Sequence, residues 1–152
     1  MRVSAKADYA VRAALELAAA PNGGPLKGER IAAAQAIPLK FLENILIQLR
    51  HENLVRSQRG PEGGYWLARP AEEIAIAQVM RAVEGPLAAV RGEPPEQLQY
   101  SGAAETLQTV WVALRANLRE VLEQVTLADV VSGKLPASVA SLAADPDAWL
   151  RR

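Results

Sequence analysis

The chain has 152 residues; half of them are hydrophobic, only 5% are aromatic, and the formal net charge at pH 7 is zero. This length allows one domain with one core, and the many alanines favour a mainly helical protein over a large β-sandwich. No cysteine is present, which excludes disulfides, thiolate metal sites, cysteine-held iron–sulfur clusters and thiol nucleophiles.

Charge is nearly balanced along the chain as well. Residues 1–84 carry 11 Lys and Arg against 9 Asp and Glu, and residues 85–152 carry 6 against 8, so their net charges are +2 and −2. This asymmetry has the direction expected of a nucleic-acid binder but is too small to decide the function. The first ten residues include three charged ones, and no uncharged run reaches the roughly 18 residues of a membrane span. We therefore expect a cytoplasmic protein without a membrane partner.

The N-terminal half predicts three helices. Ser4 is a good N-cap for the strong helix formers of residues 5–20, which the turn at residues 21–25 ends. A short helix follows over residues 28–35. A third is expected over residues 39–53, with Pro38 at its first position, where a helix tolerates proline best. The second and third helices form a helix-turn-helix pattern, which is weak evidence alone because many helical bundles contain such a pair.

A β-hairpin is expected directly after these helices. Residues 54–58 and 65–69 have the composition of two short strands, and the segment RGPEGG between them contains three glycines able to adopt positive φ. A helix-turn-helix followed at once by a hairpin is the element order of a winged helix. In that fold the hairpin tip lies beside the recognition helix, where Arg59 would meet the negative potential of a narrow minor groove.

The C-terminal half predicts a short helix over residues 72–84, an irregular segment over residues 87–102 and a long helix over about residues 103–127. Large apolar residues step along the long helix by 4, 3, 4, 3 and 4, the spacing of a coiled-coil seam: Leu107, Trp111, Leu114, Leu118, Val121 and Val125. A single helix has no use for so wide an apolar face. We therefore expect it to pack against a partner helix.

Three segments of the sequence resemble a known family. They are residues 1–18, residues 31–87 with the motif RGPEGGYWLARP followed by AVEGPL, and the short TLADVV at residues 126–131. In these segments the chain is similar to the Rrf-two (Rrf2) family of bacterial winged-helix transcription regulators, and the similarity covers nearly its whole length. The hairpin motif is specific to the family, whereas the helix pair alone would not be.

The resemblance implies a homodimer that binds a roughly palindromic operator in double-stranded DNA, with a long helix crossing between the subunits. It also implies residue roles by position. The recognition helix would be residues 39–50, the wing would contribute a minor-groove pair, and the N-terminal segment would lie against phosphates. The residues expected to face DNA are Arg2, Ser4, Lys6, Leu39, Lys40, Phe41, Glu43, Asn44, Arg50, Arg59 and Gly60.

The chain departs from the family where several members hold an iron–sulfur cluster. The three cysteine positions of those members correspond to about Gly92, Leu98 and Ala104. A histidine ligand of some members corresponds to Leu107, and a carboxylate ligand to Asp8. Because no thiolate is present, we expect no cysteine-ligated cluster and no metal site. An effector, if the protein has one, would be a small molecule.

Several side chains keep two interpretations. Lys40 and Asn44 form either a solvent-exposed face or base contacts, since Asn pairs bidentately with adenine and Lys contacts guanine or phosphate. Phe41 either packs into the core or touches a thymine methyl group. Trp111 fits the dimer core, and Trp66 on the wing could pack on a neighbouring element. In the other interpretation, both belong to an apolar effector pocket in place of the cluster, walled by Trp66, Leu98, Tyr100 and Trp111.

The sequence thus predicts a mainly α protein with a small β-hairpin. It would have a winged helix-turn-helix DNA-binding domain over residues 1–86, a connector or effector loop over 87–102, and a dimerisation helix with a tail over 103–152. The predicted function is sequence-specific transcription regulation, and we favour a repressor over an activator. The alternative is a winged-helix module that docks proteins and does not bind DNA. An enzyme lacks support, because the chain has no thiol, one histidine and no phosphate-cradling glycine loop before a helix.

Overall fold

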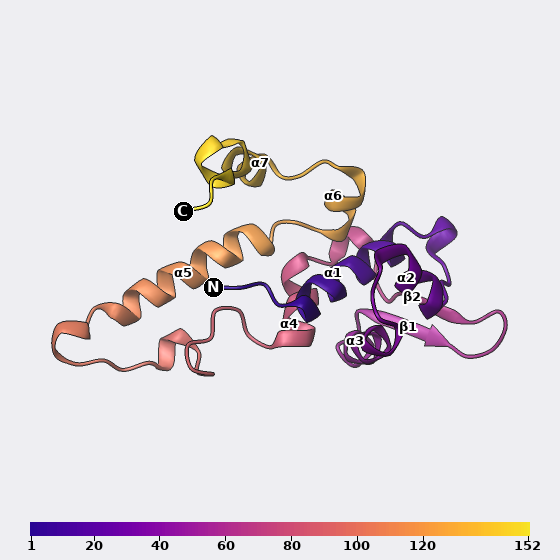
Figure 1. The fold of residues 1–152 in the computed structure, drawn as a ribbon, viewed down its shortest axis with the longest axis horizontal. Coiled ribbons are helices and arrows are strands. Elements are labelled where there is room, and N and C mark those ends of the chain that lie inside the picture. The colour runs from indigo at the N-terminus through magenta and orange to yellow at the C-terminus, as the bar shows by residue number, and fades with distance from the viewer.

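The computed structural model describes all 152 residues and is mainly helical, with one two-stranded antiparallel sheet (Figure 1). The α-helices are α1 (Ala5–Ala18), α2 (Gly28–Gln35), α3 (Leu39–His51), α4 (Ile76–Glu84), α5 (Leu107–Leu122), α6 (Leu127–Ser132) and α7 (Ala137–Ala144). The strands are β1 (Val55–Gln58) and β2 (Gly64–Leu67). Short 3₁₀ turns are η1 (Pro21–Gly23), η2 (Ala71–Glu73), η3 (Pro95–Gln97), η4 (Gly102–Ala104) and η5 (Pro146–Trp149). None of the helices is both long enough and apolar enough to span a bilayer.

The first three helices form the centre of a body that holds the main core. Ser4 is the N-cap of α1, and its Oγ accepts a hydrogen bond of 3.0 Å from the Ala7 amide. Apart from Leu17, the buried residues of α1 are alanines, so the neighbouring helices approach its backbone closely. Pro38 is the residue before α3 and not its first residue. One side of α3 is fully buried and consists of Leu42, Ile45, Leu46 and Leu49. The opposite side of the helix is left to solvent.

The two strands form the predicted hairpin, the wing of the fold. Arg56 pairs with Trp66 across the ladder. The outer edge of β2 is tied to the loop before α2, where Leu26 and Tyr65 exchange backbone hydrogen bonds of 2.9 and 2.8 Å. Gly64 permits this approach, because it has φ +148° and a Cβ at this position would lie 2.5 Å from the Leu26 carbonyl oxygen. The loop before α2 therefore fixes the wing to the helical body.

Two segments from the C-terminal half complete the body. α4 packs along α1, and α6 packs against α1 and η2. Backbone hydrogen bonds of 2.9 Å run from Ile76 to Val125 and from Leu127 to Ile74. Leu127 is completely buried in the same core as α1 and α3. Val125 lies beyond the end of α5 and is 7% exposed against its own subunit, so its assignment to the dimer seam is wrong.

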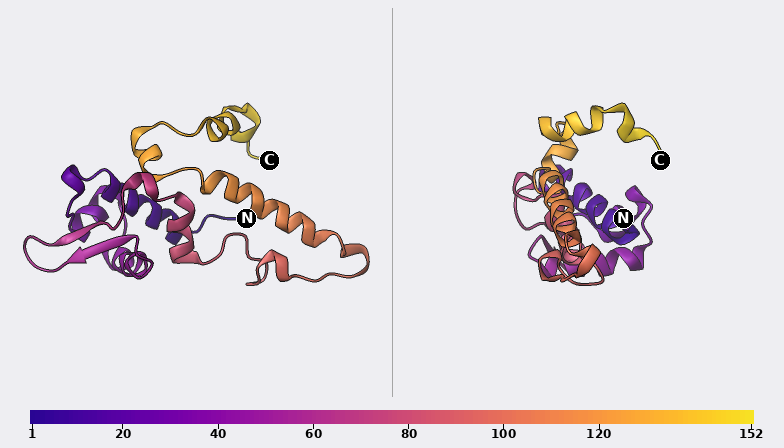
Figure 2. Two further views of the ribbon diagram at one scale, coloured as in Figure 1. Left: turned by 180° about the vertical axis from the view of Figure 1, so that it is seen from behind. Right: turned by 90° about the vertical axis from the view of Figure 1, so that its left-hand side faces the viewer.

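α5 and the segment before it form an arm that projects from the body (Figures 1 and 2). The chain runs outward from α4 through η3, turns near η4 and returns along α5. The Gln108 side chain donates to the carbonyl oxygens of Pro95 and Glu96 at 3.3 and 3.1 Å, and Arg115 forms an ion pair with Glu96. These contacts hold η3 on α5. The helix is shorter than predicted, and none of its residues is buried.

Candidate nucleic-acid interface

The exposed side of α3 presents the predicted recognition residues to solvent. It also carries Ile47, which is 42% exposed and was not identified from the sequence. Ile47 lies one turn beyond Glu43 and Asn44, so an apolar side chain lies among polar ones on this surface. A helix of this kind fits the width of the DNA major groove, where polar groups meet base edges and apolar groups meet thymine methyls. All six predicted α3 residues are exposed: Leu39, Lys40, Phe41, Glu43, Asn44 and Arg50.

The structure places Phe41 at the edge of this surface and not in the core. Its ring is 42% exposed and packs edge-on against Tyr9 of α1, with the ring centroids 5.6 Å apart. The Arg12 guanidinium lies 4.8 Å from the centroid of the same Tyr9 ring and pairs with Asp8 at 2.8 Å. These contacts support the flank of α3 with side chains of α1. Phe41 is thereby held beside the recognition surface with part of its ring open to solvent.

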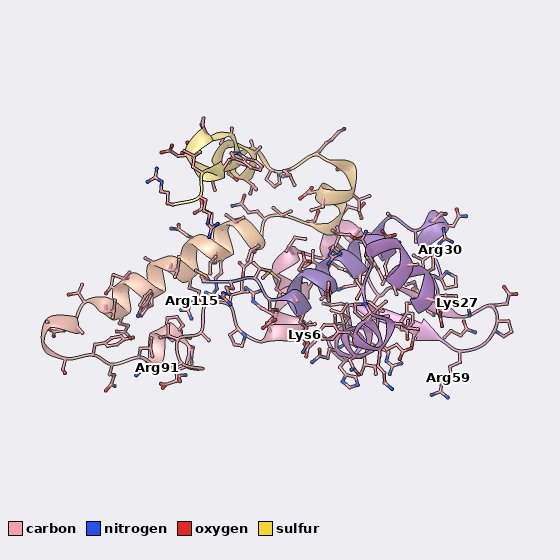
Figure 3. The ribbon with its side chains drawn as sticks, viewed as in Figure 1. Lys6, Lys27, Arg30, Arg59, Arg91 and Arg115 are labelled. Carbon is pink, nitrogen blue, oxygen red and sulfur yellow. The ribbon has the colours of Figure 1, made fainter.

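The tip of the wing carries an unpaired cation on a backbone that contacts the helical body. Arg59 is exposed, forms no hydrogen bond or ion pair with the rest of the chain, and points away from the hairpin (Figure 3). Lys27 donates to the Gly60 carbonyl oxygen at 2.6 Å. A Cβ at Gly63 would lie 2.1 Å from the Gln58 carbonyl oxygen, so only glycine fits there. Lys27 was not identified from the sequence, although it directly precedes α2.

The N-terminal segment is partly as predicted. Arg2 is exposed and Lys6 is half-buried at the start of α1. The Ser4 hydroxyl, however, already caps α1 and donates its single proton to the Glu84 carboxylate at the end of α4. A phosphate contact through this hydroxyl would require breaking the bond to Glu84. Any attraction for phosphate at this end therefore comes from Arg2, Lys6 and the positive end of the α1 dipole.

A shallow depression of about 640 Å³ lies between the end of α3 and the wing. None of its three arginines forms an ion pair with a carboxylate, although Glu52 lies in the same depression. Arg50 donates to the Ser57 hydroxyl at 2.9 Å. Unpaired guanidinium groups extend the positive potential from α3 along the wing. Only Arg50 among them was identified from the sequence; the three arginines are Arg50, Arg56 and Arg69.

The predicted effector pocket is not assembled. Trp66 lines the depression on the wing, whereas the other three residues lie in the arm, at the opposite end of the molecule (Figure 1). Leu98 is 2% exposed, and the Trp111 indole donates to the Tyr100 hydroxyl at 3.1 Å. Trp111 does not line the hollow beside them. The residues that line this hollow are mainly polar: Glu96, Gln97, Leu98, Gln99, Tyr100, Glu105 and Gln108. The four-residue grouping is therefore wrong.

The positions that correspond to cluster ligands in relatives do not fit an iron–sulfur cluster. Asp8 is occupied by its ion pair with Arg12 at 2.8 Å. No three His, Cys, Asp or Glu side chains anywhere in the chain are grouped so that they could hold a metal ion. The remaining positions carry no side-chain donor atom at all: Gly92, Leu98, Ala104 and Leu107.

The apolar face of α5 is the second surface of functional interest. Val110 at its edge is 53% exposed, and within the chain the helix packs mainly on η3 and to a smaller extent on α4. An apolar stripe left in this state gains stability when a second apolar surface covers it. The five predicted seam residues that lie on α5 are all half-buried: Leu107, Trp111, Leu114, Leu118 and Val121.

Comparison with sequences of known proteins gives a consistent result. The Rrf2 family model, described as an iron-dependent transcriptional regulator, matches residues 3–133. Rv1287 of Mycobacterium tuberculosis, whose name places it among HTH-type transcriptional regulators, is 57% identical over 145 residues, covering 95% of this chain and 90% of that protein. The HTH-type transcriptional regulator IscR of Sodalis glossinidius is 37% identical over 134 residues, covering 88% of this chain and 81% of that protein.

Solved structures agree with the sequence comparison. CymR, the global cysteine regulator of B. subtilis, matches with a TM-score of 0.73 and 31% identity over 88% of this chain and 98% of that one. IscR of T. potens matches with a TM-score of 0.69 and 29% identity, covering 100% of this chain and 93% of that one. These relatives confirm the predicted winged-helix fold and the prediction of a regulator rather than an enzyme. The chain belongs to the Rrf2 family of transcriptional regulators.

Proposed function

We propose that two copies of this chain bind one roughly palindromic operator in double-stranded DNA in the cytoplasm and repress transcription from it. The observation that carries the proposal is the combination of an exposed α3 surface with an unpaired Arg59 at the tip of the adjacent wing. One element has the shape that enters a major groove, and the other carries the charge that favours a minor groove. Both are fixed to the same small body.

The α3 surface supplies the contacts to bases. Lys40 and Asn44 are exposed on successive turns, and each matches a hydrogen-bonding pattern of the major groove. Ile47 and the exposed part of Phe41 supply apolar surface for thymine methyl groups. The unpaired arginines of the depression between α3 and the wing, with Arg2 and Lys6, then contact phosphates, which makes the affinity depend steeply on salt.

The α5 arm supports the proposal of a dimer. A 16-residue helix with no buried residue and an apolar seam is incompletely packed in a single chain. Pairing two such arms covers the seam and places two α3 surfaces on one duplex. Twofold protein symmetry then matches a palindromic site, with half-sites about one helical turn apart.

We propose regulation without a cysteine-ligated cluster, because the corresponding positions carry no thiolate and no other donor set. A small-molecule effector would act by binding one relative placement of the two α3 surfaces better than the other. Absorbance spectra after aerobic and anaerobic purification test the first statement. A coloured, iron-containing protein would show that the exclusion holds only for cysteine ligation and that other ligands hold the iron.

The function is tested by selecting bound sequences from random duplexes and then measuring affinity for the selected site. Arg59→Ala is expected to weaken binding about 10- to 100-fold, the usual effect of losing one good arginine contact. Arg91→Ala is the matched control, because Arg91 lies on the arm, far from the wing (Figure 3). No preferred sequence, or equal affinities for all three proteins, would indicate a module that docks proteins and would overturn the proposal.

A further inference from the structure

The segment after α6 contains a helix with little packing of its own. No charged residue occurs from 135 to 144, and Leu142 on α7 is 60% exposed. Within the chain α7 packs substantially only on η5, with one further hydrogen bond of 2.9 Å between the Ser138 hydroxyl and Gln124. A helix of 8 residues is not stable alone in water, so α7 needs a surface to cover it.

A groove lies between α7 and the last turns of α5. Figures 1 and 2 show α7 standing off the body along the α5 arm. The groove has a volume of about 360 Å³. One of its α5 residues, Val121, also belongs to the seam proposed to pair two subunits, so the groove continues that surface. It is lined by Asn117, Glu120, Val121, Ser138, Val139 and Leu142.

We propose that the first turn of α5 from a second copy of this chain fills this groove, so that α7 holds the partner's arm. The inference rests on the proposed homodimer. If two α5 helices pair antiparallel about a twofold axis at Leu114, the partner subunit's Leu107 lies opposite Val121, since both are seven residues from Leu114. The tip of one arm therefore reaches the base of the other arm, where α7 and the last turns of α5 line the groove.

The exposed apolar side chains support this occupant. Val110, at the tip of the arm, is 53% exposed, and Leu142, on the wall of the groove, is 60% exposed. In a symmetric dimer this contact occurs twice, and each time it would cover Val110 of one subunit and Leu142 of the other. α7 lies beyond residue 133, where the match to the family model ends. The wall of the groove that α7 supplies therefore lies outside the segment that the family model covers.

The first test compares two glutamate substitutions on α7. Leu142→Glu places a charge in the groove, whereas Ala140→Glu places the same charge on the opposite side of the helix, at an exposed position. Sedimentation equilibrium of the full chain is expected to show a dimer at least about 10-fold weaker for Leu142→Glu and unchanged for Ala140→Glu. Equal dimer strength for both variants would overturn the inference. Circular dichroism during heating checks that the body is folded in each.

The second test uses the absence of cysteine in the natural chain. Val110→Cys and Leu142→Cys are made in separate chains, mixed and treated with a short bis-maleimide. A linked pair that forms in the mixture, and less in either protein alone, supports the inference, because each chain has one thiol. A wild-type monomer would refute the homodimer itself. A wild-type dimer that gives no mixed link and tolerates Leu142→Glu would refute only the α7 contact.

Discussion

α3 and α5 are both amphipathic helices with apolar residues at helical spacing, yet their environments differ. α3 has 13 residues and four completely buried side chains, whereas α5 has 16 residues and none. The apolar side of α3 is covered by α1, α2 and α4 of the same chain. The apolar side of α5 is only partly covered, mainly by the connector and to a smaller extent by α4. An apolar stripe on a helix thus shows a need for a partner surface but does not show which chain provides it.

The body and the arm therefore differ in what stabilises them. Each large apolar side chain buried in the body contributes about 1.5–3 kcal/mol to folding at any protein concentration. The half-buried side chains of α5 reach the same contribution only when a second subunit covers them. In the proposed dimer, folding of the body would then be independent of dimerisation, and the order of the arm would depend on it.

The largest effect is expected in the body. Leu46→Ala removes a side chain that is 0% exposed, and the resulting cavity should lower the free energy of unfolding by about 2–5 kcal/mol. Ile47→Ala, at the next position, changes a side chain that is 42% exposed and should cost well under 1 kcal/mol. Chemical denaturation monitored by circular dichroism measures both. Similar losses would show that the burial pattern of α3 is wrong.

A second substitution separates the arm from the body. Leu118→Glu places a charge in the proposed seam and should abolish the dimer without shifting the unfolding of the body. DNA affinity should fall by about 100-fold, since one subunit then binds one half-site without the advantage of two linked contacts. Ala116→Glu, on the opposite side of α5 and exposed, is the control. A monomer that keeps full affinity would contradict the link between arm and DNA binding.

The smallest effect concerns the contact that holds the connector on α5. A hydrogen bond from its own backbone amide and then one from the Arg115 guanidinium lower the pKa of the Glu96 carboxyl below its usual 4.5. A carboxyl with a lowered pKa in the folded state stabilises that state above its unfolded pKa. This contribution is lost as the pH falls below about 4.5 and through the folded value.

The expected result is a modest loosening of the connector in acid. It can be followed by Trp111 fluorescence in a chain with Trp66 and Trp149 replaced by Phe, because Trp111 bonds to Tyr100 of the connector. Glu96→Gln should remove this pH response, and Glu105→Gln, which breaks no ion pair, should retain it. A response that survives Glu96→Gln would assign the titration to another group.

Most of the winged helix could be predicted from the sequence because its signals are local. The Ser4 cap, the glycine-rich turn and the apolar spacing of α3 each act within a few residues, and the structure has these features in place. The predictions that failed depended on distant contacts. Val125 continues the seam spacing, but its backbone bonds to Ile76, 49 residues earlier in the chain, which ends the helical stripe.

The effector pocket failed for the same reason. Nothing in the sequence gives the distance between the wing, which carries Trp66, and the arm, which carries Trp111. The fold places these two segments at opposite ends of the molecule. Arg56 and Arg69 were missed because their importance comes from standing near Arg50 without a carboxylate partner. No single position along the chain carries that information.

Local sequence signals specify helices α1 to α5, the hairpin, the exposed cation at its tip and the absence of thiol ligands, whereas residues 126–152, expected to be a turn, a loop and a capping stretch, contain the short helices α6 and α7. The locally specified features follow from backbone preferences, side-chain spacing and composition, which act within short segments of the chain. Only the tertiary structure decided that α6 returns to the body, that Phe41 rests on Tyr9, and that α5 and α7 are left with uncovered apolar surfaces. Those outcomes depend on which surfaces meet after the chain has folded, because burial is a property of pairs of surfaces and not of residues one at a time.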